Sequence, residues 1–252
     1  MKDWTRRMRA EVLKMRHTLL LPLHAALPLL GSAVFLLYYR VSGWSERMQI
    51  SGYMECVGAG FPFVIGIICA GNIGLEEQNH FQVLLGGSIR KWKGFAAKCL
   101  VLSGLGLLAV GGAVLLFGAG YGFIPGKEGL SVGWYLRLSL ILFLGSIPMY
   151  LEHLFLSLAF SGTVSQCAGV VQSLLSALFL TGLGEGRWFF FPCTWSSRGS
   201  IMALNCIYQG EMGAAFFCEI RKAAVICPVC FFLLCAMIGI WFHFYEGRQR
   251  ND

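Results

Sequence analysis

Charged side chains are scarce in this sequence of 252 residues: Asp, Glu, Lys and Arg make up 13% of it, whereas hydrophobic residues make up 56%. With a mean hydropathy of +0.66, this balance excludes an ordinary soluble domain and is typical of a membrane protein. A membrane-spanning helix needs about 20 mostly apolar residues. Six stretches meet that need: 19–39, 54–73, 95–123, 134–160, 166–184 and 223–245. These runs are continuous, whereas barrel strands alternate polar and apolar residues, so we expect residues 1–252 to form one all-α transmembrane domain with six spans.

The motifs of ATP-hydrolysing and zinc-dependent sites are also missing. The sequence has no G-x-x-x-x-G-K-[ST] phosphate loop, so this chain is not expected to hydrolyse ATP by that route. It has no H-E-x-x-H motif, and its five histidines are dispersed, so no bound metal is expected. One enzymatic alternative stays open. Intramembrane metalloproteases of the prenyl-protein type use a paired Glu such as Glu76-Glu77, with His153 as a candidate ligand here, although Phe81 stands where those proteases have an Arg.

Positive charge predicts the orientation of the chain and its first element. The net charge is +7, and six bases lie within the first seventeen residues. Because cytosolic loops carry an excess of Lys and Arg, both termini are expected in the cytosol. Trp4, Met8, Val12 and Met15 recur at helical spacing, so residues 1–18 are expected to form an interfacial amphipathic helix. Bases beside membrane spans suit anionic lipid head groups, and we expect no nucleic-acid partner.

The segment 74–94, between the second and third predicted spans, is unusually polar for this chain. From Leu75 to Leu85, apolar residues recur at helical spacing opposite Glu76 and Glu77, and Gly86-Gly87 follows. The pattern predicts a short amphipathic helix that ends at the glycines, on the cytosolic surface. An ordinary charged loop is the alternative.

Three polar residues fall inside predicted spans. Glu152 lies fourteen residues into a span that starts near Leu138, about 21 Å down a core of about 30 Å. A carboxylate at that depth needs a partner or a wet cavity, and Lys98, one turn into the third span, is the expected partner. His153 points about 100° away from Glu152, toward another face or a neighbouring subunit. A structural ion pair that only fixes helix packing is the alternative to a functional role.

The predicted outer segment, residues 185–222, combines aromatic rings with charges. Aromatic rings favour the head-group boundary, and ring faces and carboxylates could also hold a cationic amphipathic peptide. The candidate peptide contacts are Glu185, Arg187, Trp188, Phe191 and Trp195. Ordinary interface anchoring is the alternative, and a disulfide involving Cys193, Cys206 or Cys218 is left open.

The polar segment 74–94 resembles a motif of a known family. Permeases of type-2 ABC exporters carry E-x-G-T-x-x-x-L-L in the first cytosolic loop, followed by a base and, further on, a Lys. Five residues of this chain fall into that register: Glu77, Leu84, Leu85, Arg90 and Lys98. Asn79 and His80 stand in place of the Gly and Thr of the motif. The resemblance implies that this segment is the coupling helix, which binds a separate ATPase subunit through Glu76, Glu77, Phe81, Leu84, Leu85 and Arg90.

Over its whole length the chain resembles the lantibiotic-immunity branch of these permeases, and most of all the G-type subunit. The similar stretches are AEVLKMRHT at 10–18, EHLFLSLAF at 152–160 and GLGEGRWFFFPCTWSSR at 182–198. This resemblance implies a subunit without catalysis of its own, in the bacterial cell membrane, that removes an antimicrobial peptide. It implies a second, related permease subunit and two copies of an ATPase subunit that bind ATP and Mg, while this chain binds no cofactor. Bacitracin-type peptide exporters, and a membrane scaffold or channel, are the alternatives.

Overall fold

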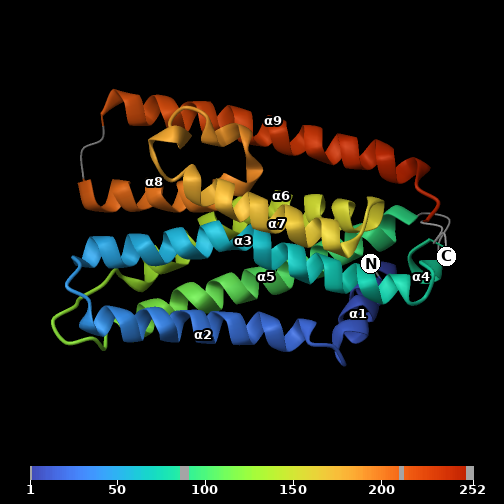
Figure 1. The fold of residues 1–252 in the computed structure, drawn as a ribbon, viewed down its shortest axis with the longest axis horizontal. Coiled ribbons are helices and arrows are strands. Elements are labelled where there is room, and N and C mark those ends of the chain that lie inside the picture. The colour runs from blue at the N-terminus through green and yellow to red at the C-terminus, as the bar shows by residue number, and fades with distance from the viewer. Residues whose placement is uncertain (1, 86–90, 210–212, 248–252) are drawn as a thin grey trace.

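The computed structural model describes residues 2–85, 91–209 and 213–247, and within them it contains helices joined by turns and no strand. The elements in chain order are α1 (Lys2–Met15), α2 (Leu20–Val41), α3 (Glu46–Glu77), α4 (Gln82–Leu85), α5 (Lys91–Tyr121), α6 (Val132–Ala159), α7 (Gly162–Leu178), η1 (Gly182–Gly184), η2 (Trp188–Phe190), η3 (Pro192–Thr194), α8 (Trp195–Gln209) and α9 (Ala214–Phe244). The long helices lie side by side in one elongated bundle (Figure 1). The predicted all-α fold is confirmed.

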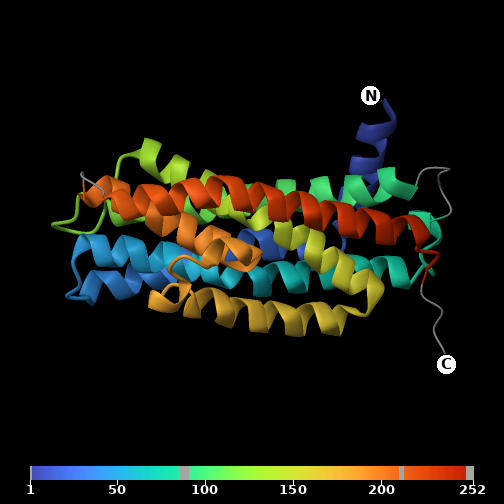
Figure 2. The same cartoon turned by 90° about the horizontal axis from the view of Figure 1, so that it is seen from above.

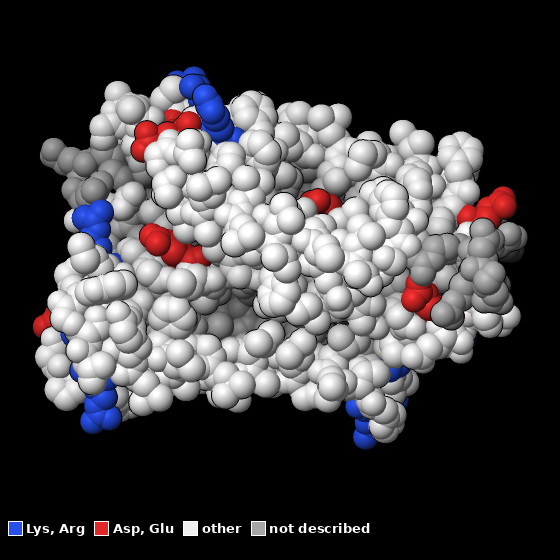
Figure 3. Space-filling view, viewed as in Figure 1, with Lys and Arg blue, Asp and Glu red and all other residues white. Residues whose placement is uncertain are grey.

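Five of these helices, α2, α3, α5, α6 and α9, are long and apolar enough to cross a membrane. They correspond to all of the predicted spans except 166–184. The middle of the face drawn in Figure 3 is mostly uncharged, as expected for helices whose side chains face hydrocarbon. The bundle is therefore that of a membrane-embedded helical protein.

The sixth predicted span, 166–184, is not confirmed as one helix. Helix α7 has 17 residues and ends at Leu178, and the short turns η1 to η3 separate it from α8. Both α7 and α8 lie along α3, so together they follow one long helix with an irregular excursion between them (Figure 1). The carbonyl groups freed at the end of α7 are satisfied by Arg198, whose Nε donates to Phe179 O at 2.5 Å and whose Nη2 donates to Thr181 O at 2.6 Å. The last carbonyl groups of a helix need partners when the helix ends inside a bundle, and Arg198 supplies them here.

Helix α3 holds the centre of the bundle and contacts α2, α6, α7 and α8. Its approach to α7 and α8 depends on glycine. A Cβ atom at Gly169 would come within 2.7 Å of the carbonyl oxygen of Pro62, and one at Gly58 within 2.7 Å of the Ser197 backbone. Small residues let helix backbones come this close in membranes, where close packing replaces the hydrophobic effect as a driving force.

Helix α1 crosses the long axis of the bundle steeply instead of joining it (Figure 2). Of the helix predicted for residues 1–18, Lys2–Met15 is helical, and Met15 at its end is fully buried. Of the remaining predicted stripe, Trp4 is 36% and Val12 40% exposed, so only part of the stripe faces protein. Helix α4 and the last turn of α9 lie at the same end of the bundle as α1 (Figure 1).

The predicted helix from Leu75 to Leu85 is wrong, because α3 continues to Glu77 and then ends in a turn. The amide of Phe81 donates to Glu76 O at 2.9 Å, and the amide of His80 donates to Glu77 O at 3.0 Å. This is the pair of bonds of a Schellman motif, with His80 in the left-handed position at φ +49°. Only the four residues of α4 follow, and Gly86-Gly87 lies outside the described residues.

Candidate functional site

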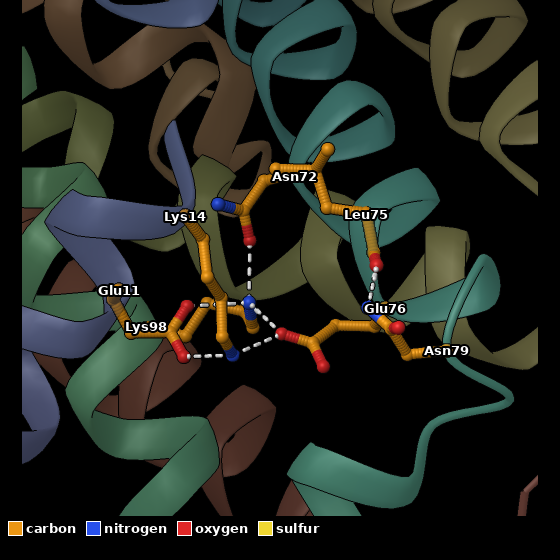
Figure 4. A network of polar contacts seen from close by, with 7 residues as sticks. All are labelled: Glu11, Lys14, Asn72, Leu75, Glu76, Asn79 and Lys98. Atoms are coloured by element: carbon orange, nitrogen blue, oxygen red, sulfur yellow. Dashed lines mark hydrogen bonds and ion pairs between the residues drawn. The ribbon is translucent and has the colours of Figure 1, made fainter. Parts of the chain in front are cut away.

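A group of charged side chains is buried where α1, α3 and α5 meet (Figure 4). We call it the Lys98 cluster: it consists of Glu11 and Lys14 from α1, Asn72 and Glu76 from α3, and Lys98 from α5. Lys98 and Glu76 are each 1% exposed, Asn72 is fully buried and Glu11 is 7% exposed. Charged residues are almost never buried to this degree unless they are paired, so the pairing decides what the cluster does.

Lys98 uses every donor it has. Its Nζ donates to Glu11 Oε2 at 2.6 Å, to Asn72 Oδ1 at 2.7 Å and to Glu76 Oε1 at 2.9 Å. An ammonium group has three N–H donors and no acceptor, so the amide oxygen of Asn72 must be the atom that faces Lys98. The Asn72 Nδ2 and Glu76 Oε2 atoms then have no hydrogen-bond partner in the described part of the chain. Lys98 thus joins α5 to both α1 and α3.

Lys14 closes the cluster from the other side. Its Nζ lies 2.7 Å from Glu11 Oε1 and 2.6 Å from Glu76 Oε1. Burial by itself would lower the pKa of Lys14, but the hydrogen bonds and attraction of Glu11 and Glu76 outweigh burial and raise that pKa. Two ammonium groups therefore face two carboxylates, and the charges balance. A buried charge left without its partner would cost several kcal/mol.

Two further contacts fasten the same end of the bundle. At the start of α5, Lys93 Nζ lies 3.2 Å from Asp3 Oδ2 of α1, and Lys91 Nζ donates to the carbonyl oxygen of Tyr245, just past α9, at 2.5 Å. The hydrogen bond from Lys93 and the nearby Arg7 lower the pKa of Asp3. The first turns of α5 are thus held by α1, α3 and the end of α9.

The predicted ion pair between Lys98 and Glu152 is wrong. Glu152 Oε1 accepts a hydrogen bond from Gln172 Nε2 of α7 at 2.5 Å, while all partners of Lys98 lie on α1 and α3. The sequence placed Glu152 at a depth along α6, but depth does not say in which direction a side chain points. Glu152 faces α7, and Lys98 faces α1.

His153 is fully buried inside this chain and does not face a neighbouring subunit. Its Nδ1 lies 3.0 Å from Ser165 Oγ, and its Nε2 lies 2.9 Å from Gln172 Oε1. Since an amide oxygen only accepts, Nε2 carries the proton. Gln172 therefore bridges Glu152 and His153, and this polar group fastens α6 to α7.

Sequence reasoning missed Glu11 and Asn72. Asn72 and Glu76 are four residues apart and so share one face of α3, a spacing that could have marked them as a pair. Glu11 gave a weaker signal, because it lies in a helix expected to sit on lipid, three residues before Lys14. No local pattern indicated that Lys98 would reach it.

The residues predicted to bind an ATPase are mostly turned inward. Phe81 is 5% and Leu84 4% exposed, and the Phe81 ring lies 6.4 Å from the Tyr245 ring. Leu85 packs at the edge of the same core, and Glu77 is half-buried. Phe81 cannot be a free docking anchor, because the left-handed turn before α4 folds it into the protein. Arg90 lies outside the described residues.

The candidate peptide contacts divide into buried and exposed residues. Trp188 is 4% and Trp195 8% exposed, and both form a core with α9. Trp188 Nε1 donates to Glu219 Oε1 at 2.8 Å, and Trp195 Nε1 donates to Phe189 O at 3.1 Å. These two rings hold the protein together, so they are not available to a peptide. Glu185, Arg187 and Phe191 are exposed.

The predicted outer segment, residues 185–222, is not a simple loop, because it contains η2, η3, all of α8 and the start of α9. Its cysteines are free thiols: Cys193 is buried, whereas Cys206 and Cys218 are exposed.

Comparison with protein-family models, with curated proteins and with solved structures gave no match to this chain.

Proposed function

We propose that this chain is a permease subunit of an ATP-driven ABC exporter that removes a lantibiotic or a similar antimicrobial peptide from the bacterial cell membrane. It works beside a second, related permease and two copies of an ATPase subunit, which carry ATP and Mg. In this proposal the end of the bundle that bears α1 and α4 faces the cytosol, as do both termini.

The observation that carries the proposal is the Lys98 cluster and its place in the bundle. An ATPase that pushes on the segment between α3 and α5 must move whole helices and not merely bend a loop. Lys98, Glu76 and Glu11 join α5, α3 and α1 where that segment leaves the bundle. A buried junction with balanced charges is stiff, because separating its members would strand charges in a medium of low dielectric constant. Force applied beside it is therefore passed on to three helices at once.

The exposed residues of the segment 185–222 suit a cationic amphipathic substrate. Glu185 and Phe191 offer a carboxylate and a half-exposed ring near the end of α7. A ring face and a carboxylate together attract ammonium and guanidinium groups. The recognition surface in this proposal is smaller than the sequence suggested, since Trp188 and Trp195 are buried.

The metalloprotease alternative gains no support from the geometry. Glu76 is bound by Lys14 and Lys98, and His153 is hydrogen-bonded to Ser165 and Gln172. In the part of the chain that the structure describes, no three His, Cys, Asp or Glu residues lie close enough to hold a metal ion.

Two measurements test the proposal together. The chain is purified in mild detergent from its native membrane, and ATP hydrolysis by co-purifying protein is measured with and without a panel of lantibiotics. In parallel, a deletion strain is exposed to the same peptides and to an antibiotic with a cytosolic target. We expect ATP hydrolysis that is stimulated by peptide. We also expect the deletion strain to become more sensitive to at least one of the peptides, while its sensitivity to the antibiotic with a cytosolic target stays unchanged. The proposal would be refuted if both tests fail: the purified protein brings no ATPase activity with it, and the deletion leaves the sensitivity of the cells to every peptide unchanged.

A further inference from the structure

An apolar cavity of about 260 Å³ lies inside the bundle between α2, α3, α5 and α6. Contact between α2 and α3 is sparse compared with that between α2 and α5, and the hollow between α2 and α3 is visible on the face drawn in Figure 3. The cavity is larger than the roughly 150 Å³ apolar cavity that is known to bind benzene. It therefore has room for a hydrocarbon ligand, and it opens between two helices that are long and apolar enough to face lipid.

The lining of the cavity contains no charged side chain, and His24 is its most basic member. His24 is 8% exposed, and its Nδ1 lies 2.6 Å from the carbonyl oxygen of Leu20. Since a carbonyl oxygen only accepts, Nδ1 carries the proton, and Nε2 of the neutral ring is an acceptor. That Nε2 atom is buried and has no partner among the described residues.

The backbone adds a second acceptor at the same residue. Pro28 lies four residues after His24 inside α2. Proline has no N–H, so the carbonyl oxygen of His24 loses the helical hydrogen bond that it would otherwise accept. His24 thus has a carbonyl oxygen without its helical donor, and the Nε2 atom of its ring, which belongs to the lining of the cavity, has no donor either within the part of the chain that the structure describes.

We infer that this cavity is a binding site for a single-chain amphiphile with a hydroxyl head group, such as a long-chain alcohol. The hydroxyl group donates to His24, and the chain runs along α2 toward Phe35 and Tyr53. From His24 to Phe35 the helix rises about 16 Å at about 1.5 Å per residue, which suits an extended chain. A cationic head group is excluded by the lining, because no carboxylate is there to pair with it. The site is therefore distinct from any surface that binds a cationic peptide, and it does not rest on the proposed transport function.

The ligand test uses the full chain in lipid nanodiscs and two probes. The first probe is dodecanol with a photoreactive group at the methyl end of its chain, and the second is the methyl ether of the same molecule, which cannot donate a hydrogen bond. We expect the alcohol to label peptides near Phe35 or Tyr53, with an affinity about five-fold higher than that of the ether, the ratio typical of one net hydrogen bond. Equal affinities of the two probes, or labelling elsewhere in the chain, would overturn the inference.

Three variants locate the site. His24→Phe should reduce the affinity for the alcohol to that for the ether. Gly60→Leu and Gly31→Leu should each abolish labelling, because both glycines line the cavity and a Cβ atom at either would meet no other atom within 4 Å. Gly104→Leu is the matched control: its Cβ atom also has open space, but Gly104 does not line the cavity. Labelling that survives in both cavity-filling variants, once these are shown to fold, would place the ligand elsewhere and overturn the inference.

Discussion

Replacement of Lys98 by Met tests the buried charge cluster most directly. Methionine has a similar length and no charge, so the change removes three hydrogen bonds while it keeps most of the packing. Glu11 and Glu76 then share Lys14 alone, and the cluster carries one uncompensated negative charge. Breaking a buried pair in this way costs about 3 to 5 kcal/mol. That is a large part of the roughly 5 to 15 kcal/mol by which proteins are usually stable.

The structure also predicts a rescue. Adding Glu76→Leu to Lys98→Met removes the uncompensated charge and leaves Glu11 and Lys14 as a pair at 2.7 Å. We expect the double variant to recover most of the lost stability, because replacing a buried ion pair by apolar residues is often neutral. The matched control is Lys98→Met with Glu152→Leu, which removes an acid that does not contact Lys98 and should rescue nothing.

Stability is measured as the free energy of unfolding in a denaturing-detergent titration, followed by circular dichroism of the protein in mixed micelles. The coupling energy comes from the double-mutant cycle. A cost below about 1 kcal/mol for Lys98→Met, or equal rescue by Glu76→Leu and Glu152→Leu, would show that the cluster does not hold the helices together.

Three further predictions follow from contacts of single residues. Phe81→Ala should lower the free energy of unfolding by about 3 to 5 kcal/mol, because it empties a buried site. Gln82→Ala, at the exposed neighbouring position, is the control and should leave that free energy unchanged. Normal stability of the Phe81 variant would support a docking role instead. Arg198→Met should speed amide hydrogen exchange in residues 179–194, since the carbonyl groups of Phe179 and Thr181 lose their donor. Arg187→Met, at an exposed position, should not change the exchange. Unchanged exchange in both variants would show that Arg198 does not stabilise the end of α7. An impermeant maleimide applied to intact cells should label Cys206 and Cys218, which are exposed near the end of the bundle opposite α4. The buried Cys193 should not be labelled. Labelling of Cys206 only after the cells are opened would mean that the chain has the opposite orientation in the membrane.

The long helices could be predicted from sequence because lipid demands a continuous apolar run, and such a run is a local property. The break between α7 and α8 was harder. Gly182, Gly184 and Gly186 follow the end of α7, but Arg198, which donates to the carbonyl oxygen of Phe179, reaches it only through the tertiary fold. The end of α3 was misplaced for a related reason. The left-handed position of its Schellman motif is held by His80 instead of the usual Gly, so Gly86-Gly87 looked like the better stop.

The sequence drew attention to two members of the Lys98 cluster, but for other roles: Glu76 as an ATPase contact and Lys98 as the partner of Glu152. Glu76 and Lys98 were both singled out, and their exposed fractions of 1% show that neither is an ordinary surface charge. Their partners were not found, because the sequence gives the depth of a residue in a span but not the direction in which it points. Glu11 was hidden for a further reason: an acid in a surface helix is normally solvated, and only the steep crossing of α1 brings it to Lys98.

The Lys98 cluster also bears on how the chain is made. During synthesis Glu11 and Lys14 leave the ribosome first, Asn72 and Glu76 follow with α3, and Lys98 comes last with α5. Until α5 emerges, the nascent chain holds two acids and one base at this position, so α3 enters the membrane with a carboxylate that lacks its second ammonium group. Helices α1 and α3 should therefore stay only loosely associated at this stage, since unpaired charge in a membrane is costly. A chain truncated before residue 98 should be recognised by membrane quality control. Insertion of Lys98 with α5 should be the step that fixes α1 and α3 against each other.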